Sequence, residues 1–309
     1  MSNQIAIGVD VGGSHITSAA VDLKKLTIIS ETTFSVKVDN KAEKDIILRK
    51  WSDAINKTIV SASLMQSTNI GFAIPGPFNY KDGIALFKGE NDKYENLYNV
   101  SISEELSKYL VSEETNFRFL NDATSFAVGV SAQGKAKNCN KIIAVTLGTG
   151  FGSAFIKEGI PLVNHPEVPK EGCLWDKPFK SGVGDDYFST RWCIKRYDEI
   201  SSKSVNGVKE IAKANTDNSR LLFEEFGHNM GHFMIPFIQK YEPQLIVVGG
   251  NISKASNLFI PTLNQVVKAA GLDVRIEIST LMEDAAIIGS AKLFNVEFWN
   301  KIKNDLPVN

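Results

Sequence analysis

The chain has 309 residues, of which 43% are hydrophobic and 22% are charged, and its formal net charge is −1. This composition supplies a large buried core, and the length favours two domains. The charge balance excludes a strongly basic nucleic-acid binder and a chain with an acidic tail.

The three cysteines are odd in number and irregularly spaced, at Cys139, Cys173 and Cys193. Because no C-x-x-C pair occurs, the sequence predicts neither a disulfide framework nor a thiol zinc site. The N-terminus lacks a basic region followed by an apolar core, and no apolar run approaches the ~20 residues that cross a bilayer. We therefore expect a cytoplasmic protein without a membrane partner.

The first 120 residues alternate strand and helix patterns. Three strands at the start predict an antiparallel meander, and a helix, a strand, a long polar loop with one short strand, a second helix and a further strand follow. The expected ranges are 5–11, 16–23 and 26–36 for the meander, then 41–65, 69–74, 78–98, 102–110 and 117–120.

The second half repeats the opening theme. Strands at 142–147 and 153–157 flank Gly148–Gly152, as the first two strands flank Gly12 and Gly13, which is weak internal symmetry. After a loop with four prolines, the expected elements are helices over 185–196, 208–214 and 219–241, a strand over 245–248, and a helix, strand and helix ending near 294. Mixed strands and helices indicate the α/β class.

Both glycine turns are candidate phosphate sites, because glycine lets a phosphate approach exposed backbone N–H groups. Two such turns could close on a polyphosphate from either side. A strand and not a helix follows each turn, which excludes the dinucleotide fingerprint, and no G-x-x-x-x-G-K-[ST] motif is present. Ordinary hairpin turns are the alternative.

Two carboxylates follow expected strands. Asp10 ends the first strand and could hold Mg²⁺ through water, with a turn-stabilising aspartate as the alternative. The segment FLNDATSFAVG, residues 119–129, ends a strand and starts a helix, so Asn121 or Asp122 is a natural N-cap. Asp122 is also placed to accept a hydroxyl proton as a general base during phosphoryl transfer, and Asn121 could hydrogen-bond sugar hydroxyls.

Five motifs occur in one order along nearly the whole chain: VDVGGSH, GFAIPGP, LNDA, VTLGTGFG and QLIVVGGNIS. In this order and spacing the chain resembles the ROK family of bacterial sugar kinases and repressors. The resemblance implies a two-domain, actin-like ATPase (ribonuclease H-like) α/β fold with a cleft between the domains. We expect a smaller domain from 1–120 with a C-terminal helix at about 292–309, and a larger domain from 121–291.

The resemblance further implies ATP-dependent phosphorylation of a hexose, with glucose and its 6-hydroxyl as the first candidate, Asp122 as base, and Mg²⁺ held by Asp10 through water. A homodimer is implied as well. The implied ATP and phosphate ligands are Asp10, Gly12, Gly13, Ser14, Gly148, Thr149, Gly150, Gly249, Gly250 and Asn251. The implied sugar ligands with clear motif matches are Gly76, Asn121 and Asp122.

The chain departs from the family pattern in two places. Ser14 and His15 stand where Thr and Lys are usual, and the region after residue 160 lacks the E-x-G-H and cysteine-rich zinc motifs. A single Cys173 cannot build a closed tetrahedral site, so we predict no structural zinc. The remaining sugar-ligand candidates are His165, Glu167 and Asp176, with Lys88, Asn91 and Asp92 in the long loop. Solvated loop residues are the alternative for all of them.

The sequence leaves the acceptor and donor open. Glucose, mannose, fructose, N-acetylglucosamine and N-acetylmannosamine all remain candidates, because the divergent loop is the one that discriminates among sugars. Polyphosphate could replace ATP as donor. Two further alternatives are a sugar-responsive repressor, for which the first strand at about residue 4 leaves no room for a preceding helix-turn-helix, and a non-catalytic sugar-binding protein.

Overall fold

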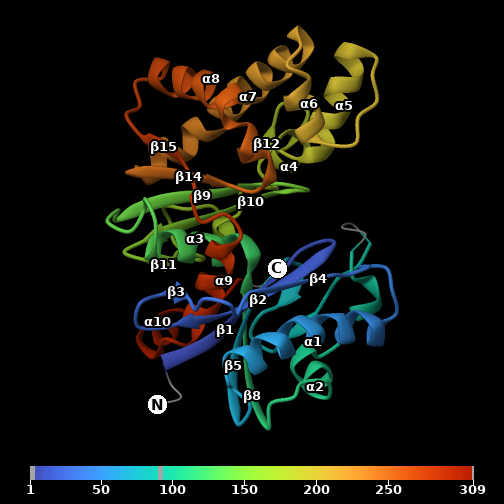
Figure 1. The fold of residues 1–309 in the computed structure, drawn as a ribbon. Helices are drawn as coiled ribbons and strands as arrows, with labels where there is room; N and C mark the ends of the chain where they lie inside the picture. Colours follow the sequence, from blue (N-terminus) through green and yellow to red (C-terminus); the bar gives the residue numbers. More distant parts are fainter. Residues whose placement is uncertain (1–3, 90–92, 308–309) are drawn as a thin grey trace. The chain divides into compact units, whose positions relative to one another are not determined.

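A computed structural model of the chain describes residues 4–89 and 93–307. Asn91 and Asp92 lie outside the described residues. The chain divides into two compact units: unit 1 comprises residues 1–133, 159–161 and 283–309, and unit 2 comprises residues 134–158 and 162–282. Strands and helices alternate in both units, which confirms the α/β class (Figure 1).

The sheet of unit 1 has the strand order β3-β2-β1-β5-β8, and β4 pairs with β2. β1 and β2 are antiparallel, whereas β5 runs parallel to β1, and β8 runs parallel to β5. The strands are β1 (Ile5–Val11), β2 (His15–Asp22), β3 (Thr27–Ile28), β4 (Phe34–Lys37), β5 (Ser67–Ile74) and β8 (Glu114–Asn121).

The predicted opening meander is confirmed, but the strand expected over 26–36 is two short strands, β3 and β4. Between them Glu31 has a left-handed φ of 63°. The Thr32 hydroxyl then accepts a hydrogen bond from the Ala20 N–H at 3.1 Å, at a position where a continuous ladder would need a backbone carbonyl. The chain therefore leaves the sheet and re-enters it.

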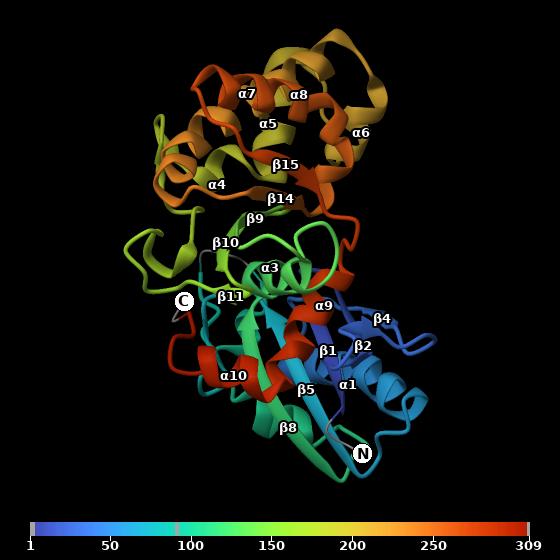
Figure 2. The ribbon, with the colours of Figure 1, turned by 90° about the vertical axis from the view of Figure 1, so that its left-hand side faces the viewer.

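Helices cover both faces of this sheet (Figure 2). Side chains alternate along β1, so Ile7 and Val9 pack into the core with α1 (Lys44–Ser61), whereas Gly8 faces α9 (Asp284–Ala291). A Cβ on Gly8 would lie 2.0 Å from the Ile287 carbonyl oxygen. The glycine thus lets the helix backbone rest directly on the strand.

Helix α3 (Asp122–Ala132) packs equally closely on α9. A Cβ on Gly289 would lie 1.9 Å from the Ser125 carbonyl oxygen, and one on Gly129 would lie 1.9 Å from that of Ala285. These backbone contacts join α3 and α9 to the unit 1 sheet. The division of the chain therefore differs from the expected one, which placed both helices in the second domain.

The rest of unit 1 consists of the C-terminal segment and several short elements. Arg118 on β8 makes cation–π contacts with the C-terminal segment. Its guanidinium carbon lies 4.6 Å from the Phe294 ring centroid and 4.3 Å from that of Trp299. The remaining elements of unit 1 are β6 (Phe78–Asn79), β7 (Ile84–Ala85), η2 (Glu95–Leu97), α2 (Ile102–Ser107), β11 (Ile160–Pro161), η5 (Lys292–Phe294) and α10 (Val296–Ile302).

In unit 2, the sheet runs β10-β9-β14-β15. β9 and β10 are antiparallel, and β14 is parallel to both β9 and β15. This matches β2-β1-β5-β8 in order and direction, so the internal symmetry suggested by the two glycine turns is confirmed. The strands are β9 (Lys141–Leu147), β10 (Phe151–Lys157), β14 (Leu245–Gly249) and β15 (Arg275–Ile278).

The helix expected over 185–196 is two helices, α4 (Gly184–Tyr187) and α5 (Thr190–Ser201). The chain breaks between them because the Thr190 N–H and hydroxyl both donate to the Gly148 carbonyl at 2.8 Å. The other elements of unit 2 are η3 (Lys170–Gly172), β12 (Pro178–Phe179), β13 (Gly182–Val183), α6 (Val208–Ala214), α7 (Asp217–Tyr241), η4 (Asn251–Ala255) and α8 (Ser256–Ala269).

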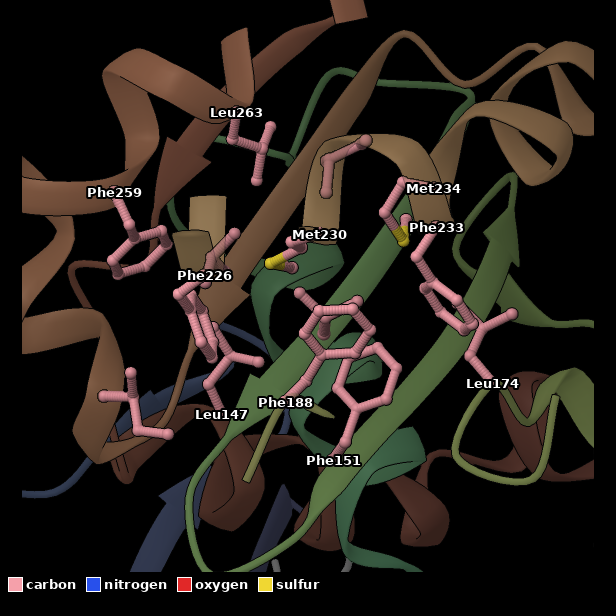
Figure 3. Close-up of a cluster of buried hydrophobic side chains, with 14 of the residues drawn as sticks. Leu147, Phe151, Leu174, Phe188, Phe226, Met230, Phe233, Met234, Phe259 and Leu263 are labelled. Atoms are coloured by element: carbon pink, nitrogen blue, oxygen red, sulfur yellow. The ribbon is translucent and has the colours of Figure 1, made fainter. Parts of the chain in front are cut away.

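Aromatic and methionine side chains fill the core of unit 2 (Figure 3). Helix α7 contributes Phe226, Met230 and Phe233, which pack against Phe151 and Phe188. The Phe233 ring centroid lies 5.0 Å from that of Phe188 and 5.8 Å from that of Phe151. Among the helices that the structure describes, none is both long enough and apolar enough to cross a membrane.

The backbone contact at Gly289 predicts a large stability effect. Gly289→Ala should lower the free energy of unfolding by about 3 kcal/mol, since a methyl group would overlap the Ser125 carbonyl and neither backbone can move freely. Urea unfolding measures this. Gly207→Ala is the control, because a Cβ there meets nothing within 4 Å, and it should change the stability by less than about 1 kcal/mol. Equal effects of the two substitutions would contradict the packing argument.

Candidate active site

Parallel pairing brings three predicted site residues, Asp10, Gly76 and Asn121, to one edge of the unit 1 sheet. Asp10 on β1 lies opposite Ala73 on β5, and Asn121 on β8 lies opposite Ile74. Gly76 follows two residues after the end of β5. Because the strands are parallel, their carboxyl ends meet at the same edge, which is where α/β sheets bind ligands.

Asn121 and Asp122 have different structural roles at the start of α3. The Asn121 side-chain oxygen accepts a hydrogen bond from the Thr124 N–H at 3.1 Å, so Asn121 is the N-cap of α3. Its amide nitrogen lies 3.3 Å from the Tyr80 hydroxyl. Asp122 is the first helical residue, and its carboxylate accepts the Ala123 N–H at 2.9 Å. The capping role is thereby filled without Asp122.

Burial dominates the electrostatics of this edge. It raises the pKa of Asp122, while the Ala123 N–H and the positive charge of Lys93 act in the opposite direction. The pKa of Asp10 is raised to about 7, first by burial and then by the negative charges of Asp122 and Glu283. A carboxylate with a raised pKa is a better proton acceptor, which suits a general base.

The first glycine turn has its carbonyls held by side chains from elsewhere in unit 1. The Tyr94 hydroxyl donates to the Gly12 carbonyl at 2.7 Å, and the Asn40 side-chain amide donates to the Gly13 carbonyl. Within the described residues, the backbone N–H groups of Gly13 and Ser14 have no acceptor. The turn therefore presents two donors to a ligand, as a phosphate site requires.

Lys93 is a site residue that the sequence analysis did not identify. A Cβ on Gly13 would lie 3.2 Å from the Lys93 Cε and 3.4 Å from its Nζ, so the ammonium group lies against the first turn. Its charge also acts on Asp122. The turn has no lysine or arginine of its own, and its His15 lies 3.9 Å from Glu283. Lys93 stands in the long polar loop, where no local pattern distinguishes it.

The second turn is built in the same way from unit 2. Thr190 donates twice to the Gly148 carbonyl, and the Arg191 guanidinium donates to the Thr149 carbonyl at 3.3 Å. In the described part of the chain, the N–H groups of Thr149 and Gly150 have no acceptor. Two unrelated sets of side chains thus leave the same kind of donor pair in both turns.

The segment from Gly249 to Asn251 lies beside this second turn. Gly249 ends β14 opposite Thr146 on β9. Gly250 has a φ of 82°, and a Cβ on it would lie 2.4 Å from the Leu147 carbonyl oxygen. The side chain of Asn251 is exposed and accepts a hydrogen bond from the Lys254 ammonium at 2.8 Å. Unit 2 therefore brings its two predicted nucleotide segments together.

The divergent loop places its candidates among lysines of unit 2. The Glu167 carboxylate lies 3.2 Å from the Lys141 ammonium and 3.9 Å from the His165 ring, and the hydrogen bond from Lys141 lowers its pKa. Asp176 is exposed and pairs with Lys177 at 2.9 Å. Over the described ranges, no three His, Cys, Asp or Glu side chains converge as a metal site would need. The sugar-binding roles of these residues stay predictions.

The Asp10 carboxylate fits the magnesium role. It is partly exposed at the strand end, and no described residue hydrogen-bonds to it. Burial and the neighbouring Asp122 and Glu283 carboxylates raise its pKa, so a bound cation would favour its ionised form. Mg²⁺ keeps several waters and takes phosphate oxygens, so one such carboxylate is sufficient to direct it to the first turn.

The raised pKa of Asp10 predicts a pH-dependent stability. The folded state binds the proton more tightly than the unfolded chain, whose pKa is about 3.8, so ionisation destabilises the fold as the pH rises from about 4 to about 7. Asp10→Asn removes this cost. We expect the variant to exceed the wild type in unfolding free energy by at most about 4 kcal/mol above pH 7, with the difference vanishing near pH 4.

Urea unfolding at several pH values, without magnesium, measures this difference. Asp53→Asn, at an exposed position on α1, is the control and should show no such trend. A less stable Asp10→Asn at pH 8 would mean that ionised Asp10 stabilises the fold.

Comparison with known proteins adds relatives that match most of the chain. A glucokinase of Thermotoga maritima is 25% identical over 93% of this chain and 96% of its own length. A xylose repressor of Caldicellulosiruptor bescii is 23% identical, over 92% of this chain and 76% of its own. An N-acetyl-D-glucosamine kinase of Haemophilus influenzae is 24% identical, over 82% of this chain and 86% of its own.

A solved structure shares the fold. The ROK family glucokinase of Streptomyces griseus, in complex with glucose and AMPPNP, has a TM-score of 0.68 at 20% identity and covers 94% of this chain and 98% of its own. This likeness confirms the expected actin-like ATPase fold. The model of the ROK family matches residues 6–165 and 184–297. The interval between them, 166–183, is most of the divergent loop. The chain belongs to the ROK family.

Proposed function

We propose that this protein is an ATP-dependent hexose kinase that transfers the γ-phosphoryl group of ATP to a sugar hydroxyl, with the 6-hydroxyl of glucose as the first candidate. The observation that carries the proposal is the construction of the two glycine turns. In each, side chains hold the carbonyls and leave adjacent N–H groups without an acceptor in the described residues. The relatives named as sugar kinases support it.

In this proposal Asp122 accepts the proton of the attacking hydroxyl. Its raised pKa favours proton uptake, and its place at the first turn of α3 lets nearby N–H groups stabilise the carboxylate before the transfer. Asn121 orients the sugar through its amide group, which Tyr80 holds from the other side. Both proposed roles depend on the position of Asn121 and Asp122 where β8 ends and α3 begins.

The phosphates of ATP lie on the two turns, and Asp10 directs Mg²⁺ to them. Bound magnesium would neutralise charge on the phosphate oxygens. The two compact units would serve as the two domains, and each would contribute one turn. Lys93 adds a positive charge beside Gly13, where the three carboxylates Asp10, Asp122 and Glu283 would otherwise repel a phosphoryl group.

A hollow in unit 2 supports inorganic polyphosphate as an alternative phosphoryl donor. A hollow of about 390 Å³ is lined by Arg191, Lys195 and Arg196 of α5 and also by Asp186 and Glu199. Arg191 pairs with Asp185, and Arg196 pairs with Glu199 and Glu225. Lys195 is exposed and has no ion pair among the described residues, so a phosphate chain longer than that of ATP could reach it, and inorganic polyphosphate is the alternative donor. Turnover with each donor separates the two: a Lys195→Met variant would lose rate with polyphosphate only.

The base role of Asp122 predicts a large catalytic loss. Asp122→Asn should lower kcat by about 10²–10⁴-fold, because the amide cannot accept the proton. A coupled ADP-release assay over a panel of hexoses measures this and names the acceptor. Asp82→Asn, at an exposed position in the turn of the β6–β7 hairpin of the same unit, is the control and should keep wild-type turnover. Sugar-dependent turnover that survives in Asp122→Asn would remove Asp122 as the base.

The charge at Lys93 predicts a separate effect on the transfer step. Lys93→Met should lower kcat by about 10–100-fold, and Lys93→Arg should restore part of it, because the lost interaction is with phosphoryl charge. Lys57→Met is the control, since Lys57 is exposed on α1 and has no role in the proposed site. A Lys93→Met enzyme with unchanged kcat, or an equal loss in Lys57→Met, would contradict the role.

A further inference from the structure

Two histidines outside the proposed active site stand side by side on α7. His228 and His232 are one helical turn apart, and both side chains are exposed. Their Nε2 atoms lie 3.3 Å apart, and their ring centroids lie 4.5 Å apart. Two of the four histidines of the chain therefore point their outer ring nitrogens at one another.

We propose that His228 and His232 chelate a divalent transition-metal ion that favours imidazole, with Zn²⁺ as the reference ion. The argument is geometric. Zinc binds imidazole nitrogen at about 2.0–2.1 Å in tetrahedral geometry, which sets two nitrogen ligands about 3.3–3.4 Å apart. The observed separation of the two Nε2 atoms equals this edge. An ion can bridge them without a change of helix geometry, and water would complete its coordination.

The residues around His228 and His232 leave both imidazoles accessible to a metal ion. In the turn before His228, α7 carries two charged residues, Glu224 and Glu225. Glu225 is held by the Arg196 guanidinium at 2.8 Å. No described residue other than its partner histidine hydrogen-bonds to either imidazole. The described residues provide no third His, Cys, Asp or Glu at this place, so the affinity must be below that of a closed four-ligand site.

A metal at this place would brace a weak turn of α7. Pro236 lies inside the helix and has no N–H, so the carbonyl of His232, four residues earlier, loses its helical donor. The opposite face of the same turns carries Met230 and Phe233 into the core of unit 2. A bridge between successive turns that binds only the folded helix would stabilise that core, and the stabilisation would grow with the logarithm of the metal concentration above the dissociation constant.

Thermal unfolding of the full chain with increasing ZnCl₂ tests the proposal, with isothermal titration calorimetry for stoichiometry. We expect Tm to rise with zinc concentration and one zinc equivalent to be lost in His228→Asn and in His232→Asn alike. The double variant should match either single one, because one imidazole does not chelate. Asparagine has a helix propensity close to that of histidine, so these variants should fold.

His165→Asn is the matched control in the same unit, and it should keep the full zinc response. All these variants retain the three cysteines, so zinc bound by thiols remains as a constant background. A zinc response that is absent in the wild type, that is as large in the double variant as in the wild type, or that disappears in His165→Asn would overturn the proposal. Because the readouts are binding and unfolding, they do not depend on the kinase proposal.

Discussion

Parallel hydrogen bonding of β1 to β5 and of β5 to β8 is the constraint on which the candidate site depends. It fixes Asp10 opposite Ala73 and Asn121 opposite Ile74, so residues more than one hundred positions apart end at one edge of the sheet. A slip of one residue would turn these side chains to the other face. The register is secured by alternation, since one face of β1 is buried against α1 and the other lies against α9.

In both glycine turns, the groups proposed to bind phosphate are backbone N–H groups and not side chains. Tyr94 and Asn40 hold the carbonyls of one turn, and Thr190 and Arg191 hold those of the other. With these carbonyls occupied, the adjacent N–H groups have no acceptor among the described residues and are available to the proposed phosphate ligand. The two halves of the fold therefore share strand order and the orientation of the peptide groups, although the side chains that enforce it are unrelated.

The buried carboxylates of the candidate site lower the stability of the fold. Burial raises the pKa of Asp10 and of Asp122, so ionised carboxylates at the sheet edge oppose folding. Lys93 and the first N–H groups of α3 offset part of the cost at Asp122. Strongly shifted groups of this kind gather at functional sites. The tight backbone packing of Gly289 against Ser125 contributes rigidity beneath them.

The sequence by itself determined the features that depend on neighbouring residues. These are the strands around both glycine turns, a helix N-cap at Asn121 or Asp122 and the repeated strand–turn–strand unit, because alternation, glycine and capping act over a few positions. Only the tertiary structure decided the position of Lys93 against Gly13, the break before Thr190 and the pairing of Glu167 with Lys141. Each of these is a contact between segments distant in the chain, which no local pattern encodes.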